Sequence, residues 1–218
     1  MLIEVQAQRF VQKLQGLVTL TATTLGSLRV AQTEGPGDEA TRAGLRQYMS
    51  AGGATGIAPV QAIPSTAAQW LIYNPLSNPV TAFLDSVGMQ LTSGTAGAGA
   101  TLLACIVPPS FAPATIPTVS AANVKIQNAN AVSTKASSLV VAASQTLQNA
   151  AAGNWFPIGQ MRTTGTLLGQ TQIVGDPFDG KLAIAPGCGL ALCVISPTGT
   201  TPLFTPYANW REYASDLE

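Results

Sequence analysis

Short apolar runs separated by turn residues dominate the chain from Thr66 onward. The runs are rich in Val, Ile, Leu and aromatic residues, whereas the segments between them are rich in Gly, Pro, Asn and Ser. This pattern is typical of β-strands joined by turns. The strands predicted in this way are 67–74, 80–88, 101–107, 139–142, 155–161, 165–174, 181–185, 190–195 and 210–213. Because no helical pattern alternates with them, we expect an all-β fold, a β-sandwich or jelly roll.

Two connections have recognisable turn chemistry. The stretch "PLSNP" at 75–79 separates the first two predicted strands and predicts a β-hairpin. The stretch "GDPFDG" at 175–180 predicts a turn, in which Pro177 sets the backbone, Asp side chains bond back to it and Gly180 adopts a positive φ.

The N-terminal part of the chain differs from the rest. Leu2, Val5, Phe10, Leu14 and Leu17 form a helical stripe, and alternating residues follow it, so this part is an arm with a helical turn or a pair of short strands. Five of the nine charged residues of this part lie at 33–53, where Asp38 is suited to cap a short polar helix or ordered loop. We therefore expect an arm with a little helix at 1–54 and a β-sandwich domain at 55–218.

The low charge of the chain excludes several classes of protein. Ten basic and ten acidic residues cancel, and charged residues make up 9% of the chain, against roughly 25% in an average soluble protein. A nucleic-acid-binding protein would need an excess of Lys and Arg, and no apolar run reaches the roughly 18 residues of a membrane helix. Glu4, Arg9 and Lys13 interrupt any apolar signal core, so we expect assembly in a cytoplasm.

The few charges are also unevenly distributed. Asp85 is the only charged residue between Arg46 and Lys125, and the stretch 55–79 has none. A surface of this kind is suited to packing against neighbouring subunits, where an unpaired charge would be costly. The residues expected at such an interface are Phe10, Leu14, Ile57, Ala62, Ile63 and Trp70.

The sequence offers little catalytic chemistry. The absence of histidine removes the Ser-His-Asp and Cys-His nucleophile systems and any His-ligated metal. The three cysteines fit no disulfide framework and are expected to be small buried apolar residues. Asp176 and Asp179 are the only close carboxylate pair in the β region, and turn chemistry accounts for them. We expect no enzyme activity, no catalytic residue, no cofactor and no metal.

Aromatic residues leave one alternative open. Trp70, Tyr73, Trp155 and Trp210 could stack on sugars if they were exposed, although aromatic residues within strands are more often part of a core or an interface.

The order of four stretches resembles that of virion structural proteins of tailed bacteriophages. These stretches are "TGIAPVQAIPSTAAQWLIYNP", "FLDSVG", "SGTAGAGATLLACIV" and "LAIAPGCGLALCVIS". The resemblance covers about 55–107 and 181–213 and implies a capsid decoration or cement protein that binds the major capsid protein on the head surface as a homotrimer. The alternative that it leaves open is a head or tail fibre protein that recognises host glycans.

Overall fold

The computed structural model describes residues 18–22, 28–32, 36–50, 56–94, 99–161, 173–197 and 202–214. The chain divides into two compact units, Met1–Ala43 and Gly44–Glu218. In the first unit, β1 (Val18–Ala22) and β2 (Leu28–Gln32) form an antiparallel two-stranded sheet, and helix α2 spans Pro36–Arg42. The predicted short helix is therefore present, but the predicted cap is wrong, because the helix begins at Pro36 and Asp38 lies within it. Proline suits a first helical turn.

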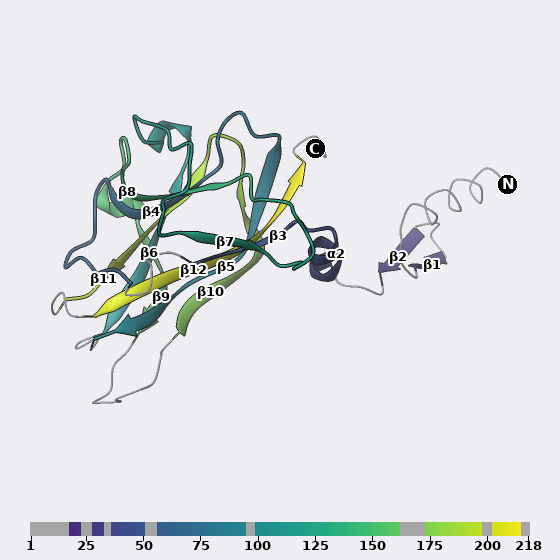
Figure 1. The fold of residues 1–218 in the computed structure, drawn as a ribbon, viewed down its shortest axis with the longest axis horizontal. Helices are drawn as coiled ribbons and strands as arrows, with labels where there is room; N and C mark the ends of the chain where they lie inside the picture. The colour runs from purple at the N-terminus through teal and green to yellow at the C-terminus, as the bar shows by residue number, and fades with distance from the viewer. Residues whose placement is uncertain are drawn as a thin grey trace. The chain divides into compact units, whose positions relative to one another are not determined.

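The second unit, here called the body, consists of two five-stranded sheets (Figure 1). Sheet I has the strand order β10-β5-β12-β3-β7, and sheet II has the order β8-β4-β11-β6-β9. The strands are β3 (Arg46–Ser50), β4 (Ala67–Tyr73), β5 (Val80–Ser93), β6 (Ala100–Val107), β7 (Lys125–Asn128), β8 (Val140–Thr146), β9 (Phe156–Met161), β10 (Ile173–Ile184), β11 (Gly189–Ile195) and β12 (Leu203–Ala214). Two short 3-10 helices, η1 (Pro109–Phe111) and η2 (Ala152–Asn154), lie in the connections.

The strand pairing is nested. The first strand of the body, β3, pairs with the last, β12; then β4 pairs with β11, β5 with β10 and β6 with β9, all antiparallel. A long antiparallel ribbon rolled up in this manner is a jelly roll. Strands β7 and β8 lie between β6 and β9 in sequence, and each adds one edge strand to a sheet. The predicted fold class is thus confirmed.

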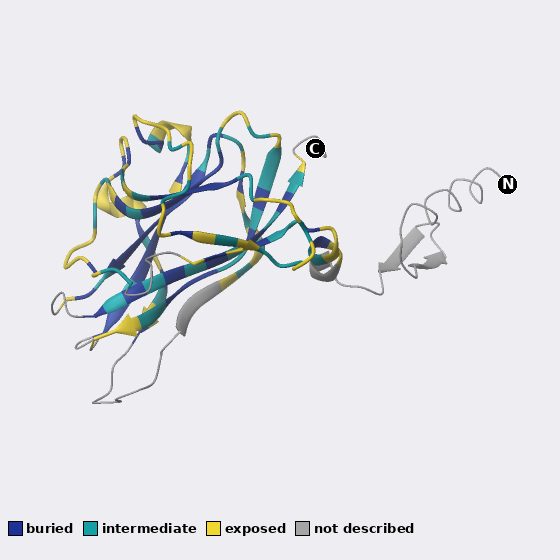
Figure 2. Ribbon diagram, viewed as in Figure 1, coloured by how far each residue is buried: buried dark blue, intermediate teal, exposed yellow. Residues whose placement is uncertain are grey.

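The two sheets bury different patterns of side chains (Figure 2). In sheet I, β12 alternates, so that Phe204, Ala208 and Trp210 enter the core between the sheets while their neighbours are partly exposed. Sheet II is buried on both faces, because the segments around η1 and η2 cover its outer face and form a second apolar cluster with it. Strand β11 therefore buries every residue from Gly189 to Val194, which explains its continuous apolar run.

The predicted hairpin at 67–74 and 80–88 is wrong, because β4 belongs to sheet II and β5 to sheet I. The "PLSNP" stretch is a crossover between the sheets. Asn74, which is fully buried, anchors it: its side-chain nitrogen donates hydrogen bonds of 2.8 and 3.0 Å to the carbonyls of Val80 and Ile184. Apolar runs show that strands are present, but they do not show which sheet each strand joins.

The predicted turn at 175–180 is a bulge within β10. Pro177 pairs with Ser86 and Leu182 with Leu84, so the strand pairs with β5 on both sides of the four residues in between. Asp179 and Gly180 there have φ values of 50° and 76°. The positive φ predicted for Gly180 is therefore confirmed, although the chain does not reverse at this point.

Candidate assembly surface

Charged residues are absent from a large part of the body. The five strands of sheet II contain none, nor do the segments 56–66, 108–124 and 147–155, which flank the sheet or cover its outer face. We call these strands and segments together the neutral surface. The strands of sheet I, in contrast, carry Arg46, Asp85, Lys125, Asp176, Asp179, Lys181, Arg211 and Glu212.

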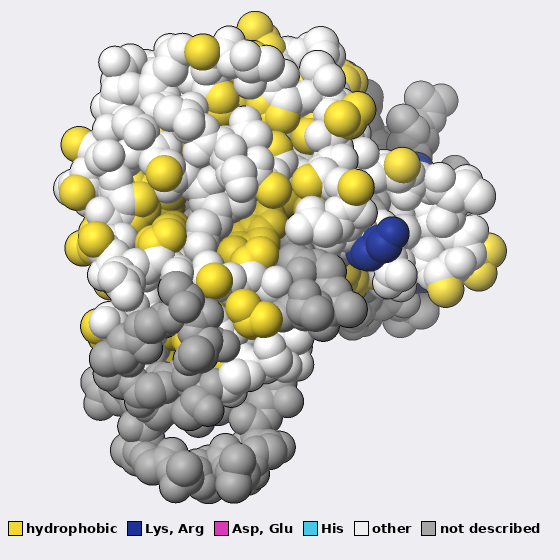
Figure 3. All heavy atoms as spheres, turned by 60° about the vertical axis from the view of Figure 1, so that its left-hand side comes forward, with side chains coloured by type: hydrophobic (Ala, Val, Ile, Leu, Met, Phe, Trp, Pro, Cys, Tyr) yellow, Lys and Arg dark blue, Asp and Glu magenta, His cyan; other side chains and the backbone are white. Residues whose placement is uncertain are grey.

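Apolar side chains are exposed on the neutral surface. Among the described residues, eight large hydrophobic side chains are exposed, and five of them belong to it: Val60, Ile63, Ile106, Ile116 and Val119. Figure 3 shows one face of the body, on which hydrophobic side chains lie among uncharged groups and Lys or Arg appears only toward one side. Such a surface, without charges and with several exposed apolar side chains, is suited to association with other chains.

A groove opens in the neutral surface where β4 separates from β11. The two strands pair as far as Trp70 and Leu192, and beyond this point Val60 lies beside β11, where it pairs with Ile195. The amide of Val60 donates a 2.9 Å hydrogen bond to the carbonyl of Val194, and the amide of Ser196 donates one of 2.9 Å to the carbonyl of Val60.

Gln69 bridges the point of separation. Its side-chain oxygen accepts a 2.7 Å hydrogen bond from the amide of Val194, and its side-chain nitrogen donates one of 2.9 Å to the carbonyl of Ala58. The segment that leads to Val60 begins at Gly56, which has a φ of 74°. A Cβ atom at this position would lie 2.9 Å from the carbonyl oxygen of Phe204. Only glycine fits this position without strain.

The groove has a volume of about 640 Å³ and is lined by the segment 60–65, the beginning of β4 (67–69), the end of β8 (144–146) and Cys193. Its wall is fixed beyond Val60 as well, because the indole nitrogen of Trp155 donates a 3.0 Å hydrogen bond to the carbonyl of Ser65. Val60 and Ile63 are 37% and 51% exposed. The groove is therefore a built, uncharged hollow with apolar side chains at its rim.

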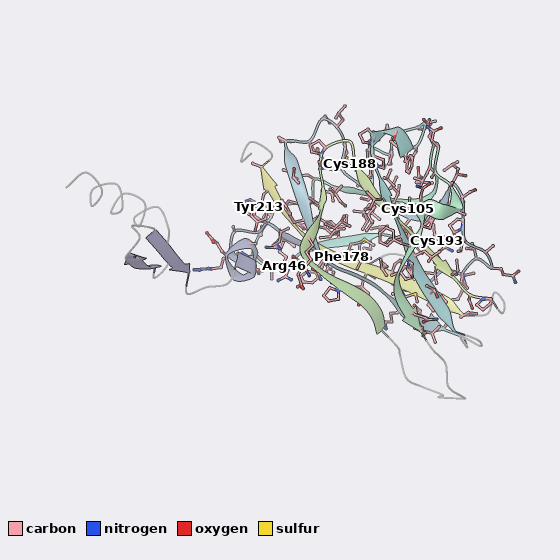
Figure 4. The ribbon with its side chains drawn as sticks, turned by 180° about the vertical axis from the view of Figure 1, so that it is seen from behind. Arg46, Cys105, Phe178, Cys188, Cys193 and Tyr213 are labelled. Carbon is pink, nitrogen blue, oxygen red and sulfur yellow. The ribbon has the colours of Figure 1, made fainter. Side chains whose placement is uncertain are left out.

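The thiol at the groove does not suit nucleophilic chemistry. Cys193 is 1% exposed, and burial raises its pKa to about 12, so the thiol stays protonated at neutral pH. Burial also raises the pKa values of Cys105 and Cys188. All three cysteines are free (Figure 4). Cys105 and Cys193 are buried as predicted, whereas Cys188 is partly exposed.

The predicted interface residues occupy different places. Ala62 and Ile63 are exposed at the groove. Ile57 is partly buried against the core and exchanges two backbone hydrogen bonds with Phe204, of 2.9 and 2.8 Å. Trp70 is 1% exposed and belongs to the core between the sheets. Phe10 and Leu14 lie outside the described residues. The structure thus brings two of the six together on the surface.

The aromatic residues considered for sugar stacking are all buried. Trp70, Tyr73, Trp155 and Trp210 are 1%, 3%, 7% and 0% exposed. Their rings fill the cores on the two faces of sheet II, so they offer no stacking platform.

Asp85 has two arginine partners, both on strands on the same side of β5. Its carboxylate accepts from Arg211 of β12, with a nitrogen–oxygen distance of 2.7 Å, and lies 3.5 Å from a guanidinium nitrogen of Arg46 on β3 (Figure 4 shows Arg46). The side chain of Asp85 is 12% exposed. This ion pair links three neighbouring strands of sheet I and accounts for the only charge between Arg46 and Lys125.

Other kinds of site were sought among the described residues. No group of three or more Cys, Asp or Glu side chains there could hold a metal ion. No helix in the described part of the chain is long and apolar enough to cross a membrane. No protein-family model matches the chain, and no curated protein matches it.

Proposed function

We propose that the protein is a structural subunit of a virus particle, a capsid decoration protein that binds the outer surface of a tailed-bacteriophage head as a homotrimer and stabilises the shell. Its partners are further copies of itself and the major capsid protein. Assembly takes place in the host cytoplasm.

The neutral surface is the single observation that carries this proposal. A charge buried at a subunit contact without a partner loses its hydration and costs several kcal/mol. A surface that has to be buried against neighbours is therefore expected to lack charges, as the segments that flank or cover sheet II do. A surface meant to remain in water has no need of this restriction.

The energy available from such a contact is large. An obligate interface can bury upwards of roughly 2,000 Å², and at about 25 cal/mol per Å² its apolar part contributes tens of kcal/mol before association and ordering costs. Even a small net free energy of binding per copy would strengthen the shell, because a shell carries many copies.

The fold and the sequence resemblance support the choice of a virion role. Jelly rolls occur in viral capsid proteins but also in lectins and cupins, so the fold alone does not select a function. The order of the four stretches named above resembles that of virion structural proteins of tailed bacteriophages, and this favours the first of these classes. The four aromatic side chains considered for the glycan-binding alternative are buried, which counts against it.

The role is tested by immunogold electron microscopy of particles of the virus that encodes the chain. Gold on the outside of the head supports a decoration protein. Gold confined to the tail, or absent from intact particles, would contradict it.

A further inference from the structure

A second feature of the neutral surface lies beside the groove. The segment 112–120 runs along the outer edge of β8, held at one end by a 3.1 Å hydrogen bond from the amide of Gln148 to the carbonyl of Phe111. At the other end Val141 donates a 3.1 Å hydrogen bond to the hydroxyl of Ser120 and accepts one of 2.8 Å from the amide of Ala121.

This segment presents apolar side chains to solvent. Ile116 and Val119 are 41% and 76% exposed, although both ends of the segment are fixed to the body. Pro113 and Pro117 restrict the backbone between the two ends. We call residues 114–119 the ridge. A β-branched side chain on a backbone held in this way loses little further conformational freedom on binding.

The edge of β8 is poorly suited to the addition of another strand. Both backbone groups of Val141 are engaged by residues 120 and 121, and the side-chain nitrogen of Gln145 donates a 2.8 Å hydrogen bond to the carbonyl of Ala143. Covered edges of this kind prevent pairing with strands of other chains. Contact on this side of the body must therefore be made by side chains.

The groove and the ridge have matching chemistry. The groove is hollow, uncharged and apolar at its rim, and the ridge is uncharged and exposes Ile116 and Val119 to solvent. Because β8 contributes residues 144–146 to the groove and is flanked by the ridge, every copy presents both features on the same part of the neutral surface. A charged segment placed in this groove would lose its hydration without meeting an opposite charge.

We propose that the ridge of one copy occupies the groove of a second copy. This inference rests on the proposed assembly of the protein with itself and names the contact that produces it. A groove on one copy that receives a ridge from the next is a heterologous contact, which closes into a ring when the rotation between copies permits. In the homotrimer, each copy contributes one ridge and receives one.

Two variants test the contact separately. Val119→Asp places a carboxylate on the ridge, and Ile63→Asp places one at the rim of the groove. Both side chains are exposed within one copy, so circular dichroism should show an unchanged fold. Each variant should raise the dissociation constant of the assembly about a hundredfold or more, because the new charge is buried without a partner. Val132→Asp is the matched control, since Val132 is 88% exposed and lies outside both features.

Mixing the two variants is the decisive step. The ridge of the Ile63→Asp chain and the groove of the Val119→Asp chain are both intact, so a one-to-one mixture should yield a two-chain species by light scattering, although each variant alone stays monomeric. Failure of the mixture to associate would overturn the ridge-in-groove contact, as would wild-type mass for Val119→Asp alone. If the wild-type chain itself is a monomer, the proposed assembly fails at an earlier step, and the two failures are thereby distinguished.

Discussion

The indole nitrogen of Trp210 donates a 2.8 Å hydrogen bond to the carboxylate of Glu212, two residues further along β12. Both side chains are buried, with exposures of 0% and 7%. The same carboxylate accepts hydrogen bonds from the hydroxyl of Ser137, at 2.6 Å, and from the amide of Ser138, at 3.0 Å. One buried acid thus connects β12 of sheet I to the segment that leads into β8 of sheet II.

Replacing this acid should destabilise the body. Glu212→Ala leaves the indole of Trp210 and the amide of Ser138 without an acceptor, so the free energy of unfolding should fall by about 2–4 kcal/mol. Glu212→Gln keeps one acceptor oxygen and should cost less. Urea denaturation at neutral pH measures both variants. Equal losses for the two variants would show that the hydrogen bonds of the carboxylate do not stabilise the fold.

A glycine in the core of sheet II should tolerate no side chain. A Cβ atom on Gly189 would lie 2.7 Å from the carbonyl oxygen of Ile72 on the neighbouring strand β4. Gly189→Ala should therefore lower the free energy of unfolding by about 1–3 kcal/mol, since the backbones must move apart. Gly153→Ala is the control, because no atom lies within 4 Å of the added methyl group. Similar melting temperatures for both variants would contradict the close approach of β11 to β4.

The stability of the protein should fall in alkaline solution. Burial raises the pKa of Cys193 to about 12, whereas an unfolded cysteine has a pKa of about 8.5. Above pH 8.5 or so the unfolded chain releases the thiol proton that the folded chain keeps, so the free energy of unfolding decreases as pH rises toward 12.

Cys193→Ala isolates this contribution. Between pH 8 and pH 10.5, the free energy of unfolding of the variant should fall by about 2 kcal/mol less than that of the wild-type protein. Other groups that burial shifts in the same direction, such as Cys105 and Tyr73, are present in both proteins and cancel in the comparison. Parallel pH dependences of the two proteins would show that Cys193 is not protected from ionisation.

The strands that sequence patterns predict well are those buried on both faces. The prediction at 190–195 agrees closely with β11 (Gly189–Ile195), and that at 101–107 agrees with β6 (Ala100–Val107), in which only Thr101 and Ile106 are not buried, because burial along most of a strand requires a nearly continuous apolar run. Strand β3 (Arg46–Ser50) was missed, since only Gln47 and Met49 are buried there and charged residues dominate its surroundings. Most of β12 was also missed, because Pro206 and several polar residues interrupt its apolar pattern, although buried positions alternate regularly along the strand.

The candidate site could be predicted only in part from the sequence. The lack of charge at 55–79 pointed to the segment that forms the wall of the groove. Sequence patterns could not distinguish exposed Ile63 from buried Trp70, because this difference depends on where β4 leaves β11. The ridge carries no strand or helix signal, and its exposure follows from its attachment to the edge of β8.

The boundary of the body can be tested by truncation. The two units divide after Ala43, eleven residues before the boundary predicted from sequence, and β3 lies between β12 and β7 in sheet I. A chain lacking residues 1–43 should therefore still melt cooperatively. Removal of residues 1–50 also deletes β3 and should give an insoluble or unfolded product, because a strand that pairs on both sides is lost from the sheet. If the shorter deletion alone unfolds the protein, the first unit is required for the fold.

The central claim is that the neutral surface mediates self-association, and the most direct test is the mass of the purified protein in solution. Multi-angle light scattering at micromolar concentration should give three times the 22.3 kDa chain mass for the wild-type protein. Ala62→Asp, which places a charge in the groove wall, should reduce this mass, whereas Gln127→Asp, on an exposed position of β7 in sheet I, should leave it unchanged. A monomeric wild-type protein, or an assembly that loses mass with Gln127→Asp but not with Ala62→Asp, would contradict the claim.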